Sequence, residues 1–272
     1  MKKIVIGVFG VALVTSWVGN LWYYHAQELE KPLFLRHYYE IRASSLERIS
    51  FYYLSNKDMN QKPAQIMLPD NTLLNVMHVE QRAERGRLQL NEAIATVVKT
   101  TGNSQTASIT ANQMTVFYNH GLIDTVPIGT ILVHPLSDQR NDYPLQMQGS
   151  GGSSDGSGYS ASLAARDLTL VSFQSSFPER ISDALEIEVE GRNASTPGLF
   201  PITLAKDERF EMRYQFRLPP SDARRYDAYN LMIAYKEAGT DSFAAAQFVN
   251  IQPQLYEEDL ARYVRLRKEE SQ

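Results

Sequence analysis

Residues 210–218 read FEMRYQFRL, and this stretch decides the fold class. Apolar and polar residues alternate here without a break. Successive side chains of a β-strand point to opposite faces, so the pattern predicts a strand with one buried face and one solvated face. Pro219 and Pro220 end the strand, because proline has no N–H to donate to a sheet.

Four further segments around this strand have the length and apolar content of strands. We expect about five strands in this half, and their spacing predicts a sandwich of immunoglobulin-like type over residues 161–253. The cysteines and the core tryptophan of true immunoglobulin domains are absent. The four segments are Leu168–Phe173, Ala184–Val189, Tyr229–Tyr235 and Ala244–Ile251.

The preceding part of the chain, residues 58–147, also predicts a small β domain. Pro69-Asp70-Asn71 separates two short apolar runs, and Asn119-His120-Gly121 separates two more, so we expect two hairpins. Ala93–Val98 is a β-branched run typical of a strand.

Between the two predicted domains, residues 148–160 read QGSGGSSDGSGYS. Glycine and serine offer almost no side chain to a core and lose much entropy on ordering. We interpret the tract as a flexible linker between domains, and a long mobile loop is the alternative.

The N-terminus predicts a membrane anchor over residues 1–24. After Lys2 and Lys3, residues 4–24 carry no charge, which is long enough for a helix to cross the hydrocarbon core at about 20 residues. Aromatic residues gather toward the far end, as at a membrane interface. A cleaved signal peptide is the alternative, although no small-x-small cleavage site follows. The two lysines favour an inside N-terminus, which places the bulk of the chain outside the cytoplasm.

Residues 25–57 predict a helical stalk. Leu35, Tyr39, Leu46, Ile49 and Tyr53 recur at helical spacings and give one apolar stripe. The stalk could pack on its own domain, or it could form a short dimerising seam and make the protein a homo-oligomer.

The C-terminal segment, residues 254–272, predicts a highly charged helix with a narrow apolar set that includes Leu260, Tyr263 and Val264. A helix of about fourteen residues is marginal alone in water, so it needs a surface. That surface is either its own β domain or a partner protein.

Composition excludes several kinds of chemistry. The chain has no cysteine, which removes disulfides, thiolate metal sites and a cysteine nucleophile. A net charge of −4 with scattered arginines gives no basic footprint, so we expect no nucleic-acid partner.

Three motifs resemble functional sites in their letters, and none is assigned a role. Ser154 lies in a G-x-S-x-G match within the Gly/Ser tract, where composition alone explains it. Asp138, Asn141 and Asp142 lack the spacing of a calcium loop. Asn193 begins a glycosylation sequon, but nothing supports a eukaryotic secretory pathway.

The five histidines also show no metal-binding spacing, and we interpret them as surface or turn residues. They are His25, His37, His78, His120 and His134.

The sequence therefore predicts a mainly β, membrane-anchored, extracytoplasmic and non-enzymatic protein with a binding or scaffolding role in a cell-envelope complex. We expect a protein partner in the envelope and no cofactor, and we assign no catalytic, cofactor-binding or metal-binding residue. The alternative is a membrane-tethered hydrolase or a sugar-binding module that acts on envelope polymers. An exposed aromatic platform would favour sugar binding, and convergent carboxylates would favour a hydrolase.

Overall fold

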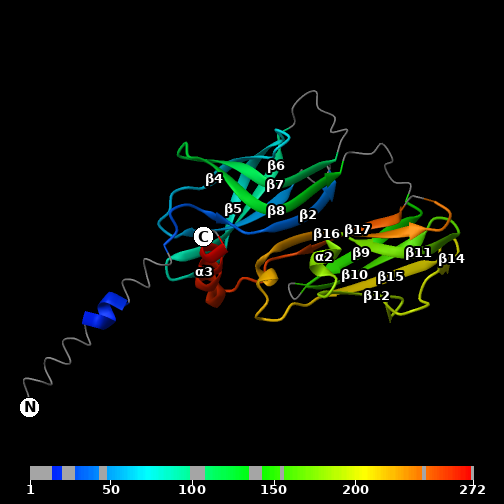
Figure 1. The fold of residues 1–272 in the computed structure, drawn as a ribbon. Coiled ribbons are helices and arrows are strands. Elements are labelled where there is room, and N and C mark those ends of the chain that lie inside the picture. The colour runs from blue at the N-terminus through cyan, green and yellow to red at the C-terminus, as the bar shows by residue number, and fades with distance from the viewer. Residues whose placement is uncertain are drawn as a thin grey trace, which may run out of the picture.

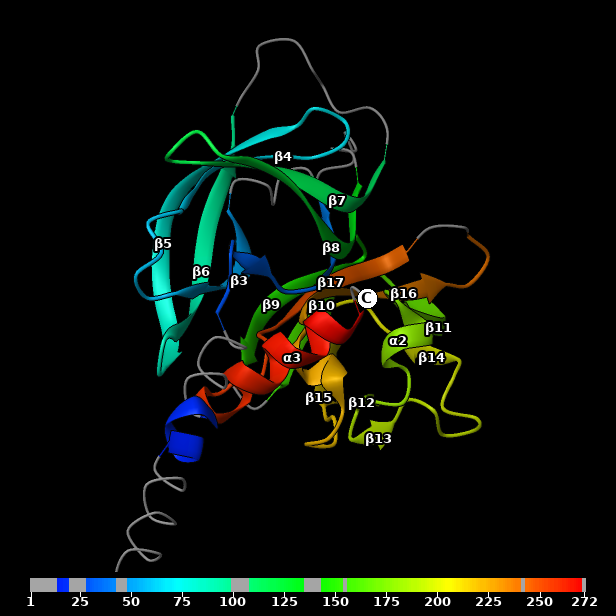
Figure 2. The ribbon, with the colours of Figure 1, turned by 60° about the vertical axis from the view of Figure 1, so that its left-hand side comes forward.

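A computed structural model describes residues 14–19, 28–42, 48–98, 108–134, 143–153, 156–240 and 243–270. The described chain is mainly β, as the sequence predicts, and it forms a twelve-stranded sheet and a five-stranded sheet. Figures 1 and 2 show the first half of the chain as a curled sheet and the second half as two packed layers beside it.

The first half contributes eight strands, which lie in the order β1-β3-β6-β5-β4-β7-β8-β2. Their bounds are β1 Leu33–Phe34, β2 His37–Arg42, β3 Ile49–Asn56, β4 Pro63–Met67, β5 Leu73–Arg85, β6 Leu88–Val97, β7 Ile109–Tyr118 and β8 Ile123–His134.

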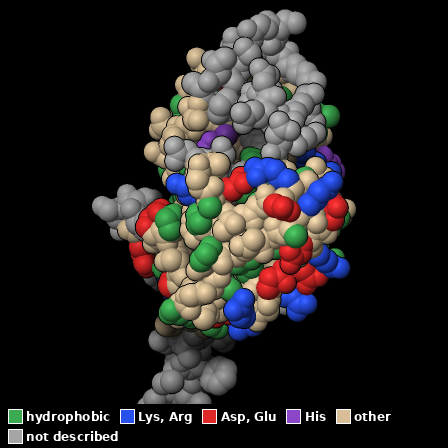
Figure 3. Space-filling view, turned by 90° about the vertical axis from the view of Figure 1, so that its right-hand side faces the viewer, with side chains coloured by type: hydrophobic (Ala, Val, Ile, Leu, Met, Phe, Trp, Pro, Cys, Tyr) green, Lys and Arg blue, Asp and Glu red, His purple; other side chains and the backbone are tan. Residues whose placement is uncertain are grey.

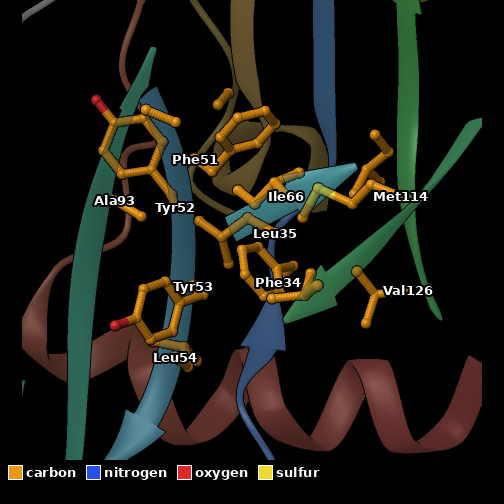
Figure 4. Packing of buried hydrophobic residues seen from close by; sticks show 14 of the residues in the cluster. Phe34, Leu35, Phe51, Tyr52, Tyr53, Leu54, Ile66, Ala93, Met114 and Val126 are labelled. Atoms are coloured by element: carbon orange, nitrogen blue, oxygen red, sulfur yellow. The ribbon is translucent and has the colours of Figure 1, made fainter. Parts of the chain in front are cut away.

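The sheet curls because β1 and β2 belong to one short stretch of chain. Only Leu35 and Arg36 separate them, yet β1 pairs with β3 at one end of the order and β2 pairs with β8 at the other. The two ends must therefore approach each other around an interior. Figure 4 shows that interior, with Phe34, Leu35 and Ile66 among the side chains that face one another.

The second half contributes nine strands and most of the helical turns. Their bounds are β9 Leu145–Gly152, β10 Ser157–Ala164, β11 Leu168–Ser175, α2 Pro178–Ile181, β12 Leu185–Val189, β13 Arg192–Asn193, β14 Ile202–Leu204, β15 Arg209–Phe216, η2 Ala223–Tyr226, β16 Ala228–Glu237, β17 Phe243–Ile251, η3 Glu257–Asp259 and α3 Leu260–Glu270.

These strands form a sandwich around a second hydrophobic cluster. One layer is the five-stranded sheet, in the order β13-β12-β15-β10-β9. The other layer is β17, β16, β11 and β14, which continue the twelve-stranded sheet. Phe210, Met212 and Phe216 of β15 are buried against residues of β16 such as Leu231 and Ile233, as the alternation in FEMRYQFRL predicts.

The two halves are joined through β2, which pairs in parallel with β8 on one side and β16 on the other. His37 lies opposite Gly129, whose φ is +85°. A Cβ at this glycine would lie 2.6 Å from the carbonyl oxygen of His37, so the approach of β8 to β2 requires glycine here.

An ion pair between a buried Asp227 and a partly buried Arg180 lies next to this joint. Arg180 Nη2 donates to Asp227 Oδ2 at 2.5 Å, and the guanidinium lies 4.2 Å from the centroid of the Tyr38 ring. Burial raises the pKa of Asp227 to about 6, and Arg180 only partly offsets that effect. The joint therefore depends on polar groups as well as on backbone pairing.

The helix α3 docks on the chain itself, but on the first half rather than on the preceding sandwich. Leu260, Tyr263 and Val264 are buried in the cluster that the curled sheet encloses. Arg267 Nη1 donates to the Phe34 carbonyl at 3.4 Å, which ties the helix to β1. The predicted C-terminal helix is confirmed, and the surface it needs is supplied by its own chain.

The predicted stalk helix over residues 25–57 is wrong, because the described part of this range forms β1, β2 and β3. The spacings of four between Leu35 and Tyr39 and between Ile49 and Tyr53 suit a strand face as well as a helix, since four is an even number. Both faces of β3 are covered, so every residue from Phe51 to Asn56 is buried. The dimerising seam, one of the two alternatives for that helix, therefore has no helix to lie on in the described part of this range.

The predicted Gly/Ser linker is also wrong. Residues 145–152 and 157–164 are the antiparallel strands β9 and β10, paired along their length. The predicted hairpins at Pro69–Asn71 and at Asn119–Gly121 are confirmed as β4–β5 and β7–β8. The boundaries proposed for two separate domains stay a prediction.

The predicted membrane anchor falls mostly outside the described residues. Residues 14–19 are helical. Among the described residues, no helix is both long and apolar enough to span a membrane.

We expect Leu260→Ala to lower the free energy of unfolding by about 2–5 kcal/mol, because it leaves a cavity under α3. Arg265→Ala, on the exposed side of the same helix, should change it by less than about 0.5 kcal/mol. Denaturant unfolding of both variants measures the difference. Equal stabilities would show that α3 does not pack as described.

His37 should make the protein sensitive to acid. It is fully buried, its Nε2 accepts a hydrogen bond from the Tyr52 backbone N–H at 2.9 Å, and burial lowers its pKa to about 3. Below about pH 6.5 the unfolded chain takes up a proton that the folded chain does not, so stability falls as pH drops toward 3. At about pH 5 the loss is roughly 2 kcal/mol.

Melting temperatures at about pH 7 and about pH 5 test this. His37→Gln, whose amide oxygen can accept the Tyr52 bond, should reduce the acid shift. His78→Gln, at an exposed position, should leave the shift as in the parent protein. If His37→Gln showed the same loss of melting temperature between the two pH values as the parent protein, the acid sensitivity would not come from His37.

Candidate ligand-binding face

The outer face of the five-stranded sheet is the best candidate site. Its geometry depends on glycines in β9 and β10, which leave room for two tyrosine rings. In the register of β9 and β10, Gly158 lies opposite Gly152 and also opposite Tyr214 of β15. A Cβ at Gly158 would lie 2.2 Å from the Tyr214 hydroxyl and 2.6 Å from the Gly151 carbonyl oxygen. The buried Tyr214 ring therefore occupies space on the inner face that only glycines leave open.

On the outer face, too, a glycine leaves space for a tyrosine ring of the neighbouring strand. Tyr159 of β10 lies opposite Gly151 of β9, and a Cβ at Gly151 would lie 2.7 Å from Cε1 of the Tyr159 ring. The ring leans across β9 into the space that a side chain would fill. Half of Tyr159 is nevertheless exposed, at 52%. Aromatic rings laid over strand glycines stabilise such pairs and present a fixed ring to solvent.

A row of outward side chains crosses the sheet at this level. Arg213 of β15 lies opposite Tyr159 on one side and opposite Glu188 of β12 on the other. Four of the five strands thus contribute one residue each to the row Glu188, Arg213, Tyr159 and Gly151. No ion pair of Arg213 occurs in the part of the chain that the structure describes.

This row lies in an open groove of about 550 Å³. We call it the outer groove. Its outward residues are Ser157, Tyr159, Glu186, Glu188, Arg209, Glu211, Arg213, Gln215 and Arg217, and its floor includes Gly158, Ser160, Met212 and Tyr214.

Charge in the outer groove is mixed rather than of one sign. The lining includes three arginines and three glutamates. Arg209 pairs with Glu211 at 2.5 Å, and Arg217 Nη2 donates to Gln215 Oε1 at 3.4 Å. Figure 3 shows the same mixture on the sandwich end of the molecule, where acidic and basic side chains lie beside one another. The face therefore offers donors and acceptors without a strong net field.

The G-x-S-x-G match has the wrong context for a nucleophile. Ser154 itself lies outside the described residues, but β9 precedes the match and β10 follows it. A nucleophile elbow needs a helix after the serine. Asp138, Asn141 and Asp142 also lie outside the described residues, whereas Asn193 is exposed in β13.

The histidines are dispersed, and the interpretation as surface or turn residues is wrong for one of them. His37 is buried in the core, where its ring packs against Tyr39, Phe51 and Tyr52. His78 and His120 are exposed, and His25 lies outside the described residues. His134 Nε2 lies 2.6 Å from Glu40 Oε1. Among the described residues no three potential ligands gather closely enough to hold a metal ion.

Comparison with known proteins gives no family. No protein-family model matches the chain, and no curated protein matches its sequence. Solved structures with some likeness include the D00-D0 domain of intimin, at 8% identity and a TM-score of 0.23 over 81% of this chain and 99% of that one.

Two further likenesses are of the same kind. The YadV chaperone has 12% identity and a TM-score of 0.20 over 81% of this chain and 99% of its own. The fibronectin(III)-like modules of CbhA from Clostridium thermocellum have 9% identity and a TM-score of 0.18 over 82% and 91%. These scores are too low to carry an argument. The class of protein is therefore set by the structure itself, as a mainly β protein with a sandwich and an open polar groove.

Sequence reasoning missed the outer groove because it treated Gln148–Ser160 as a linker. One signal was available. Tyr159 interrupts the Gly/Ser tract. Arg209, Arg213 and Arg217 recur every four residues, and the alternation in residues 210–218 places them on the solvated face of the predicted strand. The strand pairing that brings Tyr159 beside Arg213 cannot be read from either segment alone.

We expect Gly158→Ala to destabilise the protein by about 1–3 kcal/mol, because the added methyl group meets the Tyr214 hydroxyl and a backbone oxygen. Gly149→Ala is the control, since a Cβ there meets nothing within 4 Å. Thermal unfolding of the two variants measures the difference. If both were neutral, the packing of Tyr214 over Gly158 would be refuted.

Proposed function

We propose that this protein is a non-enzymatic binding protein of the cell envelope, held to a membrane by its N-terminal helix, which contacts its ligand through the outer groove. The observation that carries the proposal is the row Glu188–Arg213–Tyr159, in which an exposed ring and two charged side chains are fixed by strand register in an open groove.

A rigid sheet face suits binding. Side chains on paired strands have positions set by the register, so they are arranged before a ligand arrives and less entropy is lost on association. This face is the outside of one sheet of the sandwich, and a two-sheet sandwich supports the immunoglobulin-like fold that the strand pattern predicts. Its partner would be an envelope component within reach of the membrane.

The hydrolase alternative receives no support from the groove. Its glutamates belong to exposed strand faces, and Glu211 is paired with Arg209. A general acid usually lies in an enclosed pocket that excludes water, and the outer groove is open to solvent.

Binding through the outer groove predicts that Tyr159→Ala abolishes retention of the detergent-solubilised full chain on the detergent-insoluble envelope fraction of cells that lack this protein, where the N-terminal helix has no bilayer to enter. Tyr256→Ala is a matched control, because Tyr256 is 54% exposed but lies outside the groove. Co-sedimentation measures retention, and circular dichroism confirms folding. Equal retention of both variants would contradict the proposed site.

The proposed anchor predicts that the full chain fractionates with membranes and resists carbonate extraction, since residues 4–24 carry no charge. Protease added outside should digest the chain beyond residue 25. Deletion of residues 1–24 should release a folded protein. Recovery of a soluble parent protein that begins near residue 27 would instead indicate cleavage.

A further inference from the structure

The ligand of the outer groove can be narrowed to a chemical class. Resting on the proposed function, we propose that the outer groove binds a neutral glycan chain. Tyr159 stacks on a sugar ring, while Arg213 donates hydrogen bonds to sugar hydroxyls and Glu188 accepts hydrogen bonds from them.

Charge balance points to a neutral ligand. The groove carries as many glutamates as arginines, and Arg209 is already paired with Glu211. A polyanion would gain from the arginines but would be repelled by the neighbouring glutamates, and a polycation would meet the reverse arrangement. A ligand without charge incurs neither penalty.

The mixture of polar groups matches sugar hydroxyls. Each hydroxyl donates one hydrogen bond and accepts up to two, so a polyol needs donors and acceptors side by side. Arg213 supplies only donors, Glu188 supplies only acceptors when ionised, and Gln215 supplies both. Because Arg213 lies directly between Glu188 and Tyr159, neighbouring units of one glycan chain can together contact all three.

Tyr159 supplies the apolar contact that a sugar requires. One side of a pyranose ring presents mainly C–H groups, which pack against the negative face of an aromatic ring. The Tyr159 ring is supported from below by Gly151 and is half exposed, so it is available as a platform without rearrangement.

The groove does not resemble a protein interface. Such interfaces have an apolar core of aromatic and aliphatic residues inside a polar rim. In the outer groove Met212 and Tyr214 are buried, which leaves Tyr159 as the large apolar side chain exposed among the groove residues that the structure describes.

The dimensions fit an extended chain. The outward side chains from Arg209 to Arg217 follow one strand over roughly 26 Å, at about 3.3 Å per residue. This length allows several sugar units to lie in line along β15, with Tyr159 and Arg213 at its centre.

The test is isothermal titration of the full chain, in a detergent without a sugar headgroup, with hexasaccharides of different charge. Hexamers of β-1,4-linked glucose and of N-acetylglucosamine are neutral, a galacturonic acid hexamer is anionic, and a glucosamine hexamer is cationic. We expect a neutral hexamer to bind most tightly. Its affinity should be unchanged as ionic strength rises from about 0.1 M to about 1 M, which shortens the screening length from about 10 Å to about 3 Å.

Variants locate the site. Tyr159→Ala and Arg213→Ala should each weaken binding by about tenfold or more, whereas Tyr256→Ala should leave it unchanged. Glu188→Gln, which keeps an acceptor but loses the charge, should retain binding within about threefold.

Each other outcome overturns the inference. Preference for the galacturonate or glucosamine hexamer would show a charge-selective site. Neutral binding that survives Tyr159→Ala would place the sugar elsewhere. If no hexamer binds while Tyr159→Ala still abolishes envelope retention, the ligand is not a glycan and the proposed function stands. If retention too is unaffected by Tyr159→Ala, the proposed function fails as well.

Discussion

The parallel pairing of β2 with both β8 and β16 is the constraint on which the rest of the structure depends. It makes one continuous sheet from the curled first half and one layer of the sandwich. The pairing requires Gly129, because any side chain there would meet the backbone of His37. It also brings Tyr38 beside Arg180 and Asp227, so a partly buried charge pair lies where the two halves meet.

The C-terminal helix strengthens the same joint from another direction. The chain leaves the sandwich after β17 and returns to the first half, where Leu260 and Val264 complete the core around β3. Tyr226, which ends η2 two residues before β16 begins, donates a hydrogen bond from its hydroxyl to Asp259 Oδ1 at 3.0 Å. The segment that leads into β16 and the start of α3 are thus tied together beside the joint.

Glycine has an unusual part in the binding face. A Gly/Ser tract would usually be too costly in entropy to order. Here Tyr214 covers Gly158 from the inside and Tyr159 covers Gly151 from the outside, so the rings supply the apolar contacts that the strands lack. The tyrosine that stabilises the strands on the outer face is also the one that the groove exposes. Tyr159 therefore contributes both to the stability of the strand pair and to the proposed recognition of the ligand.

The sequence by itself determined the elements whose pattern is local. The alternation of FEMRYQFRL predicted β15, turn residues at Pro69–Asn71 and Asn119–Gly121 predicted two hairpins, and the charged segment with Leu260 and Tyr263 predicted α3. Only the tertiary structure decided the rest. In β3 both faces are covered, so successive side chains such as Phe51, Tyr52 and Tyr53 are all buried and the period-two signal is hidden. Within the Gly/Ser tract, β9 and β10 pair because two tyrosines fill the space above their glycines, and one of those tyrosines lies more than fifty residues away. The row Glu188–Arg213–Tyr159 exists because three distant segments become neighbours in one sheet, and no local pattern contains that information.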